Sequence, residues 1–259
     1  MAQKKPAEPA RPDRYAAIVV DANSGKVLFE HDASQKLYPA STAKMMTAYI
    51  VFDALQRGTL KTDQILTVSR NAAMQPRTNL AMMSSSKDRK GRVSLRQNTT
   101  KITVENAIRG MLTHSANDAA VVLAEAIGGS EAGFAEMMNA AAARLGMKDT
   151  HYTNPNGLPD TRQKTTVEDL ALLNRALLRE FPHYLPYFRT ESFTFNNHTY
   201  NNTNKLLGAY PGLDMGKTGY IGAAGWNLAA SAKQGDERVI GIVFGARTPA
   251  ERKTDMEHL

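Results

Sequence analysis

Three short motifs in this sequence place hydroxyl, amine and amide side chains at spacings that suit nucleophilic catalysis. The first is Ser41-Thr42-Ala43-Lys44, which follows Pro39 and leads into the apolar run MMTAYIVFDAL. Residues three apart on a helix share a face, so the Lys44 amine can reach the Ser41 hydroxyl. A lysine can take the serine proton if burial or a nearby positive charge lowers its pKa towards neutrality. This motif alone leaves helix capping by Ser41 as an alternative.

The same pattern occurs a second time. Ser84-Ser85-Ser86-Lys87 also has a lysine three residues after a serine, but it lies in a polar segment, residues 84–100, that we expect to be a loop with little helix. The apolar helix that follows Ser41 would instead bury and fix its serine and lysine. The first turn of that helix would also offer unpaired backbone N–H groups, including that of Ser41, to a developing oxyanion.

The second motif is Ser115-Ala116-Asn117, which lies at an expected break between two helices. The serine could pass protons, and the Asn117 amide could bond a substrate carbonyl. Ser69-Arg70-Asn71 has the same pattern, and a serine in such a place is commonly a helix N-cap. Capping by Ser115 is therefore the alternative to a catalytic role.

The third motif, Lys217-Thr218-Gly219, occurs once. As an edge strand beside a cleft it would supply a second cation, a hydroxyl and, at Gly219, a position without a side chain where substrate backbone can lie close. The Lys217 charge would favour a neutral Lys44 and an anionic substrate. The alternative is a simple turn that contains glycine.

Elements from both ends of the chain are expected to position these motifs. Residues 14–35 hold two apolar runs around Asn23-Ser24-Gly25-Lys26, and residues 225–246 hold two more around a Gly-Asp turn, so both are predicted as hairpins. The predicted helices lie between them, with Ser130 and Thr166 as N-caps of the last two. They are 41–57, 103–127 with a break near 114–117, 131–145 ending at Gly146, and 166–180.

A sheet built from both chain ends around a helical insertion would leave a cleft where the two regions meet. We expect one domain at 15–259, with its sheet from 15–38 and 205–246 and a helical subdomain at about 60–165. The charged, Pro-rich residues 1–14 are interpreted as a flexible linker, which could be the remainder after removal of a signal peptide.

The composition excludes several kinds of site. The 259 residues include no cysteine, so disulfides, thiolate metal sites and a cysteine nucleophile are excluded. The six histidines show no metal-ligand spacing and no G-x-S-x-G elbow is present, so we expect no metal and interpret His114 as a structural residue. No apolar run approaches the roughly 18 residues that span a bilayer.

The net charge of +7 would suit a polyanionic partner, and a basic cluster, KDRKGRVSLR, lies at 87–96. The cluster has no aromatic residue for base stacking and no helix to enter a groove, so we expect no nucleic-acid binding. Attraction to an anionic surface stays open. A P-loop at 212–218 is not expected either, because Gly212 and Gly216 are separated by three residues instead of four.

The order of the three motifs is more specific than any one of them. S-x-x-K, S-x-N and K-T-G follow one another at 41, 115 and 217, as in penicillin-binding proteins and class A β-lactamases. On these motifs the chain resembles the low-molecular-mass penicillin-binding proteins, serine-type D-Ala-D-Ala carboxypeptidases of the bacterial cell wall. The resemblance runs from about Tyr15 to Arg247 and includes GKVLFEHDA, HSANDAAVVLAE, MKDTHYTNPNGLPD, TTVEDLALL, NNTNKLLGAYPGLDMGKTGY and AGWNLAASA.

The resemblance implies an α/β fold with a five-stranded antiparallel sheet flanked by helices and a mostly helical subdomain. It implies that a serine attacks the D-Ala-D-Ala peptide carbonyl, D-alanine leaves, and water hydrolyses the ester. Peptidoglycan pentapeptides and β-lactams would be the partners, no cofactor would be needed, and the location would be the periplasmic or extracellular face of the envelope. The implied roles are nucleophile for Ser41, base for Lys44, proton relay for Ser115, substrate and relay contacts for Asn117 and Lys217, carboxylate binding for Thr218, and an oxyanion hole from the Ser41 and Tyr220 backbone N–H groups.

The sequence differs from related proteins at several positions, and these differences refine the predicted activity. Class A β-lactamases deacylate with a glutamate and an asparagine spaced E-x-x-x-N, but Leu172 stands four residues after Glu168, so we expect a long-lived penicilloyl-enzyme. Thr203 stands where some relatives carry an arginine, and Arg247 is a weak candidate to replace it. No second β-rich domain or amphipathic anchor is recognised in the sequence. A DD-endopeptidase that cuts cross-links, and a slow or non-hydrolysing penicillin-binding sensor, remain alternatives because they would use the same centre.

Overall fold

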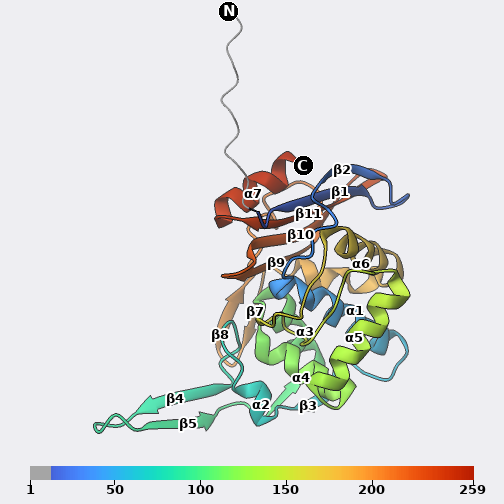
Figure 1. Ribbon diagram of the computed structural model, residues 1–259. Helices are drawn as coiled ribbons and strands as arrows, with labels where there is room; N and C mark the ends of the chain where they lie inside the picture. Colours follow the sequence, from blue (N-terminus) through green and yellow to red (C-terminus); the bar gives the residue numbers. More distant parts are fainter. Residues whose placement is uncertain (1–12) are drawn as a thin grey trace, which may run out of the picture.

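A five-stranded antiparallel sheet forms one end of the molecule in the computed structural model, which describes residues 13–259 (Figure 1). The strand order is β2-β1-β11-β10-β9, so segments from the two ends of the chain pair in the middle of the sheet. The predicted fold class is confirmed. The strands are β1 (Ala16–Asp21), β2 (Val27–His31), β9 (Leu213–Ile221), β10 (Gly225–Gln234) and β11 (Glu237–Ala246).

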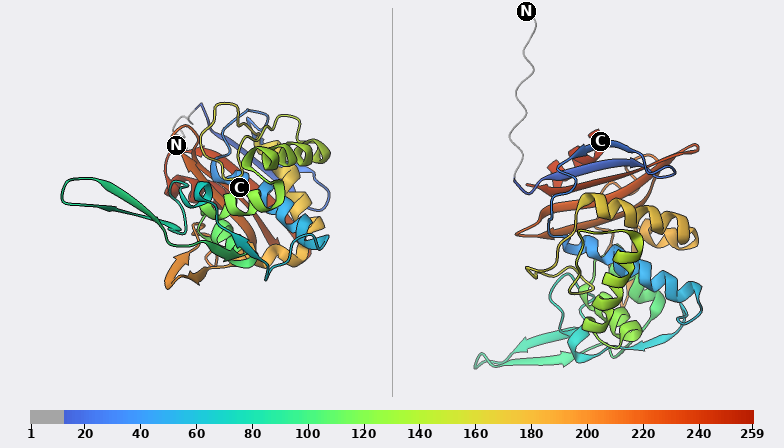
Figure 2. Two further views of the ribbon diagram at one scale, coloured as in Figure 1. Left: turned by 90° about the horizontal axis from the view of Figure 1, so that it is seen from below. Right: turned by 45° about the vertical axis from the view of Figure 1, so that its right-hand side comes forward.

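Helices cover both faces of this sheet, which explains why its central strands are apolar at successive positions. On one face Ile18 and Ile242 belong to the main core, next to α6 (Val167–Glu180). On the other face Val243 packs with Met256 of α7 (Pro249–His258). Figure 2 shows the sheet edge-on between α6 and α7. Helix α7 was not predicted from the sequence.

The helix that carries the first motif is a core helix. It starts as a 3-10 turn, η1 (Ala40–Ala43), and continues as α1 (Lys44–Gln56). All the residues from Lys44 to Phe52 are buried, so the helix is held on all sides and its first turn cannot shift without disturbing the core.

The remaining helices form the other end of the molecule. The two N-caps that the sequence predicts, at the starts of α5 and α6, are confirmed. Ser130 accepts a hydrogen bond from Gly133 N and Thr166 accepts one from Asp169 N, while α5 ends at Gly146, whose φ is 79°. The predicted break near 114–117 is confirmed. The helices are α2 (Arg70–Ala73), α3 (Val104–Thr113), α4 (Asn117–Gly128) and α5 (Glu131–Leu145).

The loop expected at residues 84–100 is a β-hairpin, so that prediction was wrong. Asp88 accepts hydrogen bonds from the backbone N–H groups of Lys90 and Arg92, which closes the turn, and Val93 and Leu95 alternate with polar residues as strands require. Other short elements were also not predicted. These elements are β4 (Met83–Lys87) with β5 (Val93–Gln97), β3 (Ile65–Thr67) with β6 (Lys101–Thr103), β7 (Ser192–Phe195) with β8 (His198–Asn201), and η2 (Pro182–Arg189).

The predicted linker at 1–14 lies outside the described residues except for its last two positions. Within residues 13–259, no helix has the length and apolar character needed to cross a bilayer.

Candidate active site

The three motifs, which are far apart in the sequence, line one cleft between the sheet and the helical region. Ser41 comes from η1, Ser115 and Asn117 from the junction of α3 and α4, and Thr218 from β9, which is the predicted edge strand. The cleft encloses about 520 Å³, within the usual range for small-molecule sites.

Ser41 and Lys44 are in direct contact. The Lys44 amine lies 3.0 Å from the Ser41 hydroxyl oxygen, as residues three apart on a helix should. Ser41 lies inside the 3-10 turn, where the N-cap residue is Pro39 and no side chain caps the turn. The capping alternative is therefore wrong for Ser41. Ala40, just before it, has a left-handed φ of 49°, a conformation that sharpens the turn leading to the serine.

The Lys44 amine is fully enclosed and has three neighbours that can accept hydrogen bonds. Besides Ser41, it donates to the Asn117 side-chain oxygen at 2.8 Å and to the Asn156 backbone carbonyl at 2.5 Å. Burial lowers the pKa of Lys44 well below its usual value, and the charge of Lys217 lowers it further, against a smaller raising effect of Asp118. This is the environment that a lysine base requires.

Ser115 is held in a conformation that serine rarely adopts, with φ at 64°. The Lys217 amine donates to its hydroxyl oxygen at 2.8 Å. The N-cap of α4 is Ala116, without a side-chain capping bond, so the capping alternative is wrong here also. Ser69, which has the same sequence pattern, does cap its helix through Ala72 N. The two S-x-N patterns thus have different structural roles.

Asn117 connects this junction to the base. Its side-chain nitrogen donates to the Pro76 carbonyl at 3.0 Å, so its oxygen faces Lys44. Its backbone N–H donates to the Thr78 carbonyl at 2.7 Å, and the Thr78 hydroxyl donates to the Ser115 carbonyl. Segment 76–78 therefore fixes the positions of both polar residues of the second motif.

Lys217 is also buried, and its amine donates to Ser115 and to the Thr218 carbonyl. Burial lowers the pKa of Lys217 to about 7, with a further lowering by the charge of Arg252. The Thr218 hydroxyl shares a hydrogen bond of 2.7 Å with the hydroxyl of Thr203. Two hydroxyl groups and a lysine thus lie along one wall of the cleft.

Gly219 allows β9 to pass close to the nucleophile. A Cβ at this position would lie 3.0 to 3.1 Å from the Pro39 carbonyl oxygen and the Ser41 and Thr42 backbone nitrogens, closer than most side chains tolerate. Next to it, the ring of Tyr220 stacks on Trp226 with 4.1 Å between ring centres. All eight residues predicted for the site therefore meet around this cleft.

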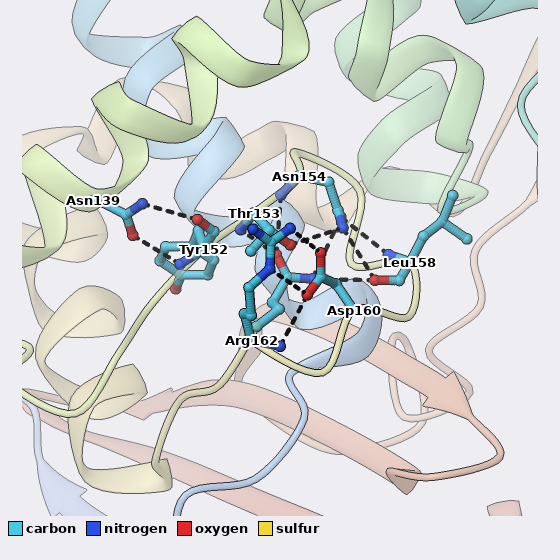
Figure 3. Close-up of polar contacts among 8 residues, drawn as sticks. Asn139, Tyr152, Thr153, Asn154, Leu158, Asp160 and Arg162 are labelled. Atoms are coloured by element: carbon cyan, nitrogen blue, oxygen red, sulfur yellow. Dashed lines mark hydrogen bonds and ion pairs between the residues drawn. The ribbon is translucent and has the colours of Figure 1, made fainter.

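The loop that supplies the third acceptor to Lys44 was not predicted from the sequence. This loop, residues 153–163, carries Asn156 and Gly157, and a Cβ on Gly157 would lie 1.9 Å from the Ala40 carbonyl oxygen. Asn154 holds the loop. Figure 3 shows its side chain against Leu158, where it accepts from Leu158 N and donates to the Leu158 carbonyl. The same side chain also accepts from Gly157 N. The Asn-Gly dipeptide in this segment is a turn signal that could have indicated it.

Arg252 was missed as well. It lies on α7, is 6% exposed, lines the cleft, and stacks its guanidinium over Trp226 at 5.8 Å. Burial lowers its pKa to about 10. Arg247, the candidate that the sequence suggested, instead forms a salt bridge with Glu251 outside the cleft lining. The sequence Thr248-Pro249-Ala250-Glu251 is a helix-start signal that would have placed Arg252 in the first turns of a helix.

Other candidate patterns have structural roles. Ser84, in the second S-x-x-K pattern, lies on the exposed hairpin and bonds the Arg96 carbonyl. His114 packs on Tyr200, and burial lowers its pKa. Gly212 lies in a turn against the Lys233 carbonyl, not in a phosphate-binding loop. Residues 13–259 contain no group of three His, Asp or Glu side chains arranged to hold a metal.

Comparisons with known proteins agree with this geometry. A family model described as D-alanyl-D-alanine carboxypeptidase matches residues 3–248. D-alanyl-D-alanine carboxypeptidase DacC of Escherichia coli is 37% identical over 95% of this chain and 60% of that protein, and DacF of Bacillus subtilis is 34% identical over 93% and 59%. The chain spans about three fifths of the length of these relatives.

Solved structures with this fold include D-alanyl-D-alanine carboxypeptidase DacD of Francisella tularensis, with a TM-score of 0.85 at 29% identity over 99% of this chain and 72% of that one. A penicillin-binding protein of Listeria monocytogenes, solved in the ampicillin-bound form, has a TM-score of 0.81 at 32% identity over 93% of each chain. Since the family model covers nearly the whole sequence and the three motifs meet in one cleft, the chain belongs to the D-alanyl-D-alanine carboxypeptidase family.

Proposed function

We propose that this chain is a serine-type D-alanyl-D-alanine carboxypeptidase that removes the terminal D-alanine from peptidoglycan stem peptides through an acyl-enzyme. The observation that carries the proposal is the contact between the Ser41 hydroxyl and the buried Lys44 amine at 3.0 Å, at the edge of the cleft. The action of the relatives named above makes D-Ala-D-Ala peptides the substrate class to test.

The acceptors around Lys44 define the direction of proton transfer. A neutral amine has two N–H donors and one lone pair, while the Asn117 and Asn156 carbonyl oxygens can only accept. The two N–H groups therefore point to these carbonyls, and the lone pair is left for the Ser41 hydroxyl proton. As the Ser41 oxygen forms its bond to the substrate carbonyl carbon, Lys44 takes this proton.

The leaving amine of D-alanine needs a proton when the peptide bond breaks. The Ser115 hydroxyl is placed to donate it, since the Lys217 amine, at 2.8 Å, can replace the proton that Ser115 gives up. A Lys217 pKa of about 7 means that this amine exchanges protons readily near neutral pH. The backbone N–H groups of Ser41 and Tyr220 would hold the oxyanion, because Gly219 brings β9 close to the start of η1.

The substrate ends in a free carboxylate, and the cleft offers cations and hydroxyls on one wall to bind it. Thr218 and Thr203 present bonded hydroxyl groups, and Arg252 presents a buried guanidinium whose Nε has no hydrogen-bond partner among the described residues. A buried arginine without a carboxylate partner is expensive to maintain, so a substrate carboxylate would relieve it. Arg252 therefore takes the role that the sequence analysis assigned weakly to Arg247.

Hydrolysis of the ester needs a water molecule and a base. None of the described residues that line the cleft is an aspartate or a glutamate, so Lys44 is the base available for this step as well.

β-Lactams would acylate Ser41 in the same way, and their adduct would be hydrolysed slowly. We further propose that the enzyme acts in the bacterial envelope, where its substrate is found.

Mass spectrometry after incubation with benzylpenicillin tests the nucleophile. The native chain should gain one adduct and Ser41→Ala none, while Ser84→Ala, the matched variant in the second S-x-x-K pattern, should behave as the native chain. Release of free D-alanine from a pentapeptide then tests the reaction. Cleavage of cross-linked dimers without D-alanine release would make the chain an endopeptidase, and labelling without either reaction would make it a sensor.

A further inference from the structure

The β4–β5 hairpin projects from the helical end of the molecule, away from the sheet (Figures 1 and 2). Every residue from Ser84 to Arg96 is exposed. A two-stranded hairpin in water is marginally stable by itself, so a projecting one is the kind of element that gains order from a partner. Its side chains indicate what that partner is.

Most of the charged residues of the hairpin are basic. Its one acidic residue, Asp88, is paired with Arg92 at 2.7 Å and is used to close the turn. Four further cations remain, and none of them forms an ion pair with another described side chain. They are Lys87, Arg89, Lys90 and Arg96. An anionic surface would attract this cluster within a Debye length of about 10 Å.

One face of the same hairpin carries its two exposed aliphatic side chains, Val93 and Leu95. In the antiparallel register Lys87 lies opposite Val93, Ser85 opposite Leu95 and Met83 opposite Gln97, and paired residues share a face. Val93 is 57% exposed and Leu95 is 43% exposed. The long stem of Lys87 can lie along this face while its amine reaches outward.

We propose that the β4–β5 hairpin is a docking element for a bilayer surface that contains anionic phospholipid. The face with Val93 and Leu95 would lie in the headgroup region, where these two side chains leave water. Lys87 on the same face, and Arg89 and Lys90 in the turn, would bind phosphate groups. A soluble polyanion would use the cations but would leave Val93 and Leu95 exposed. The combination of the two features favours the bilayer, and the proposal does not depend on the proposed reaction.

The root of the hairpin is fixed to the body of the protein, so docking would also orient the cleft. Leu80 N donates to the Asp118 carboxylate, Asn98 N donates to the Met82 carbonyl, and the Gln97 side chain donates to the Val68 carbonyl. Segment 76–78, just before this root, bonds the second catalytic motif. A bilayer under the hairpin would therefore hold the cleft at a fixed distance from the membrane.

Co-sedimentation of the whole chain with vesicles tests the proposal. The chain should bind vesicles of 30% phosphatidylglycerol in phosphatidylcholine and should bind pure phosphatidylcholine at least ten-fold more weakly. Each cation near such a surface strengthens binding about five-fold. The triple change Lys87→Gln, Arg89→Gln and Lys90→Gln should therefore weaken binding at least ten-fold. A matched variant that neutralises the exposed lysines Lys26, Lys61 and Lys148 should bind within two-fold of the native chain.

A second variant, Val93→Ser with Leu95→Ser, keeps all the charges and should also weaken vesicle binding several-fold. Penicillin labelling of every variant serves as the folding control, because the changed side chains are all exposed and none of them lines the cleft. Equal binding by the charge variant and the matched lysine variant would overturn the proposal. So would binding to isolated peptidoglycan in place of vesicles, or a dimer in sedimentation velocity that the serine variant abolishes, since the hairpin would then serve a polymer or a second copy of the chain.

Discussion

The amine of Lys44 and the backbone carbonyl of Asn156 lie 2.5 Å apart and join the first turn of α1 to a loop more than one hundred residues later. This contact, together with Asn117, occupies both N–H groups of the neutral amine. In the proposed mechanism the loop is therefore part of the proton-transfer geometry. Hydrogen bonds to the Asn154 and Gln163 side chains hold this loop in place.

Gly157→Ala should disturb this geometry. The new Cβ would meet the Ala40 carbonyl oxygen at 1.9 Å, and Gly157 has a φ of 81°, so the loop must move away from η1. We expect penicillin acylation to slow at least ten-fold and the protein to lose more than the 1–2 kcal/mol that left-handed strain costs. Gly129→Ala is the matched control, because its φ is 71° with no atom within 4 Å. Equal acylation by the two variants would show that the loop does not position Lys44.

The pH dependence of the acylation rate should show the electrostatic effect of Lys217 on the pKa of Lys44. Neutral Lys44 is the reactive form, so the rate should rise with pH on its acid limb. The Lys217 charge helps to keep the pKa of Lys44 low. Lys217→Met should therefore move the acid limb to higher pH, besides lowering the maximum rate. An acid limb that does not move when stopped-flow acylation is followed across pH would contradict this coupling.

Arg252 should matter for binding the end of the substrate. Arg252→Met keeps an apolar stem beside Trp226 but removes the charge from the cleft. The KM for a peptide ending in D-Ala-D-Ala carboxylate should rise at least ten-fold, because a charge-assisted hydrogen bond is lost. The same peptide with an amidated end should be bound equally by both proteins. Arg247→Met, in the exposed salt bridge, should leave both values unchanged.

The stability of the protein should depend on the ionisation of Asp118. Burial raises the pKa of this carboxyl to about 6, above its value of 3.8 in the unfolded chain. Its contribution to stability is therefore fully present below pH 3.8 and is lost as the pH rises through 6, by roughly 3 kcal/mol. Urea unfolding of the native chain and Asp118→Asn at several pH values should show this difference. A constant difference between pH 4 and 7 would rule it out.

The penicilloyl-enzyme should persist. Glu168 lies at the start of α6, outside the cleft lining, and no described acidic residue lines the cleft to activate water. Nitrocefin should therefore give a burst of about one equivalent followed by turnover slower than one per minute, far below typical enzyme rates of about 10 per second. Steady turnover without a burst, measured by absorbance, would identify a β-lactamase.

The elements predicted correctly from the sequence are those with a clear local signal, such as a helix N-cap or a continuous apolar run. Ser130 and Thr166 start helices because each hydroxyl caps a backbone N–H three residues on, which any sequence with that local pattern can do. The central strands were predicted because burial on both faces requires continuous apolar runs. Neither inference needed knowledge of the tertiary structure.

The sequence could not separate Ser115 from Ser69, since both have an asparagine two residues later. Tertiary contacts decide their roles: Lys217 approaches Ser115 from a distant strand, whereas Ser69 bonds only its own helix. Asn156 was missed for a related reason. Its contact with Lys44 uses the backbone carbonyl, a group that every residue has, so no residue type indicates it. The hairpin at 83–97 was predicted as a loop. Its many charged and polar residues made the alternation of Val93 and Leu95 with polar residues hard to recognise.

The pairing of β1 with β11 also determines when the candidate site can form during synthesis. Ala17 pairs with Val243, so β1 has no partner on that side until more than two hundred further residues have been made. Such distant pairing makes folding slow, and the apolar first strand stays uncovered in the meantime. Ser41, the proposed nucleophile, is translated early, but the cleft around it also needs residues of β9, β10 and α7. A chain that stops before these elements would carry Ser41 without its surrounding cleft.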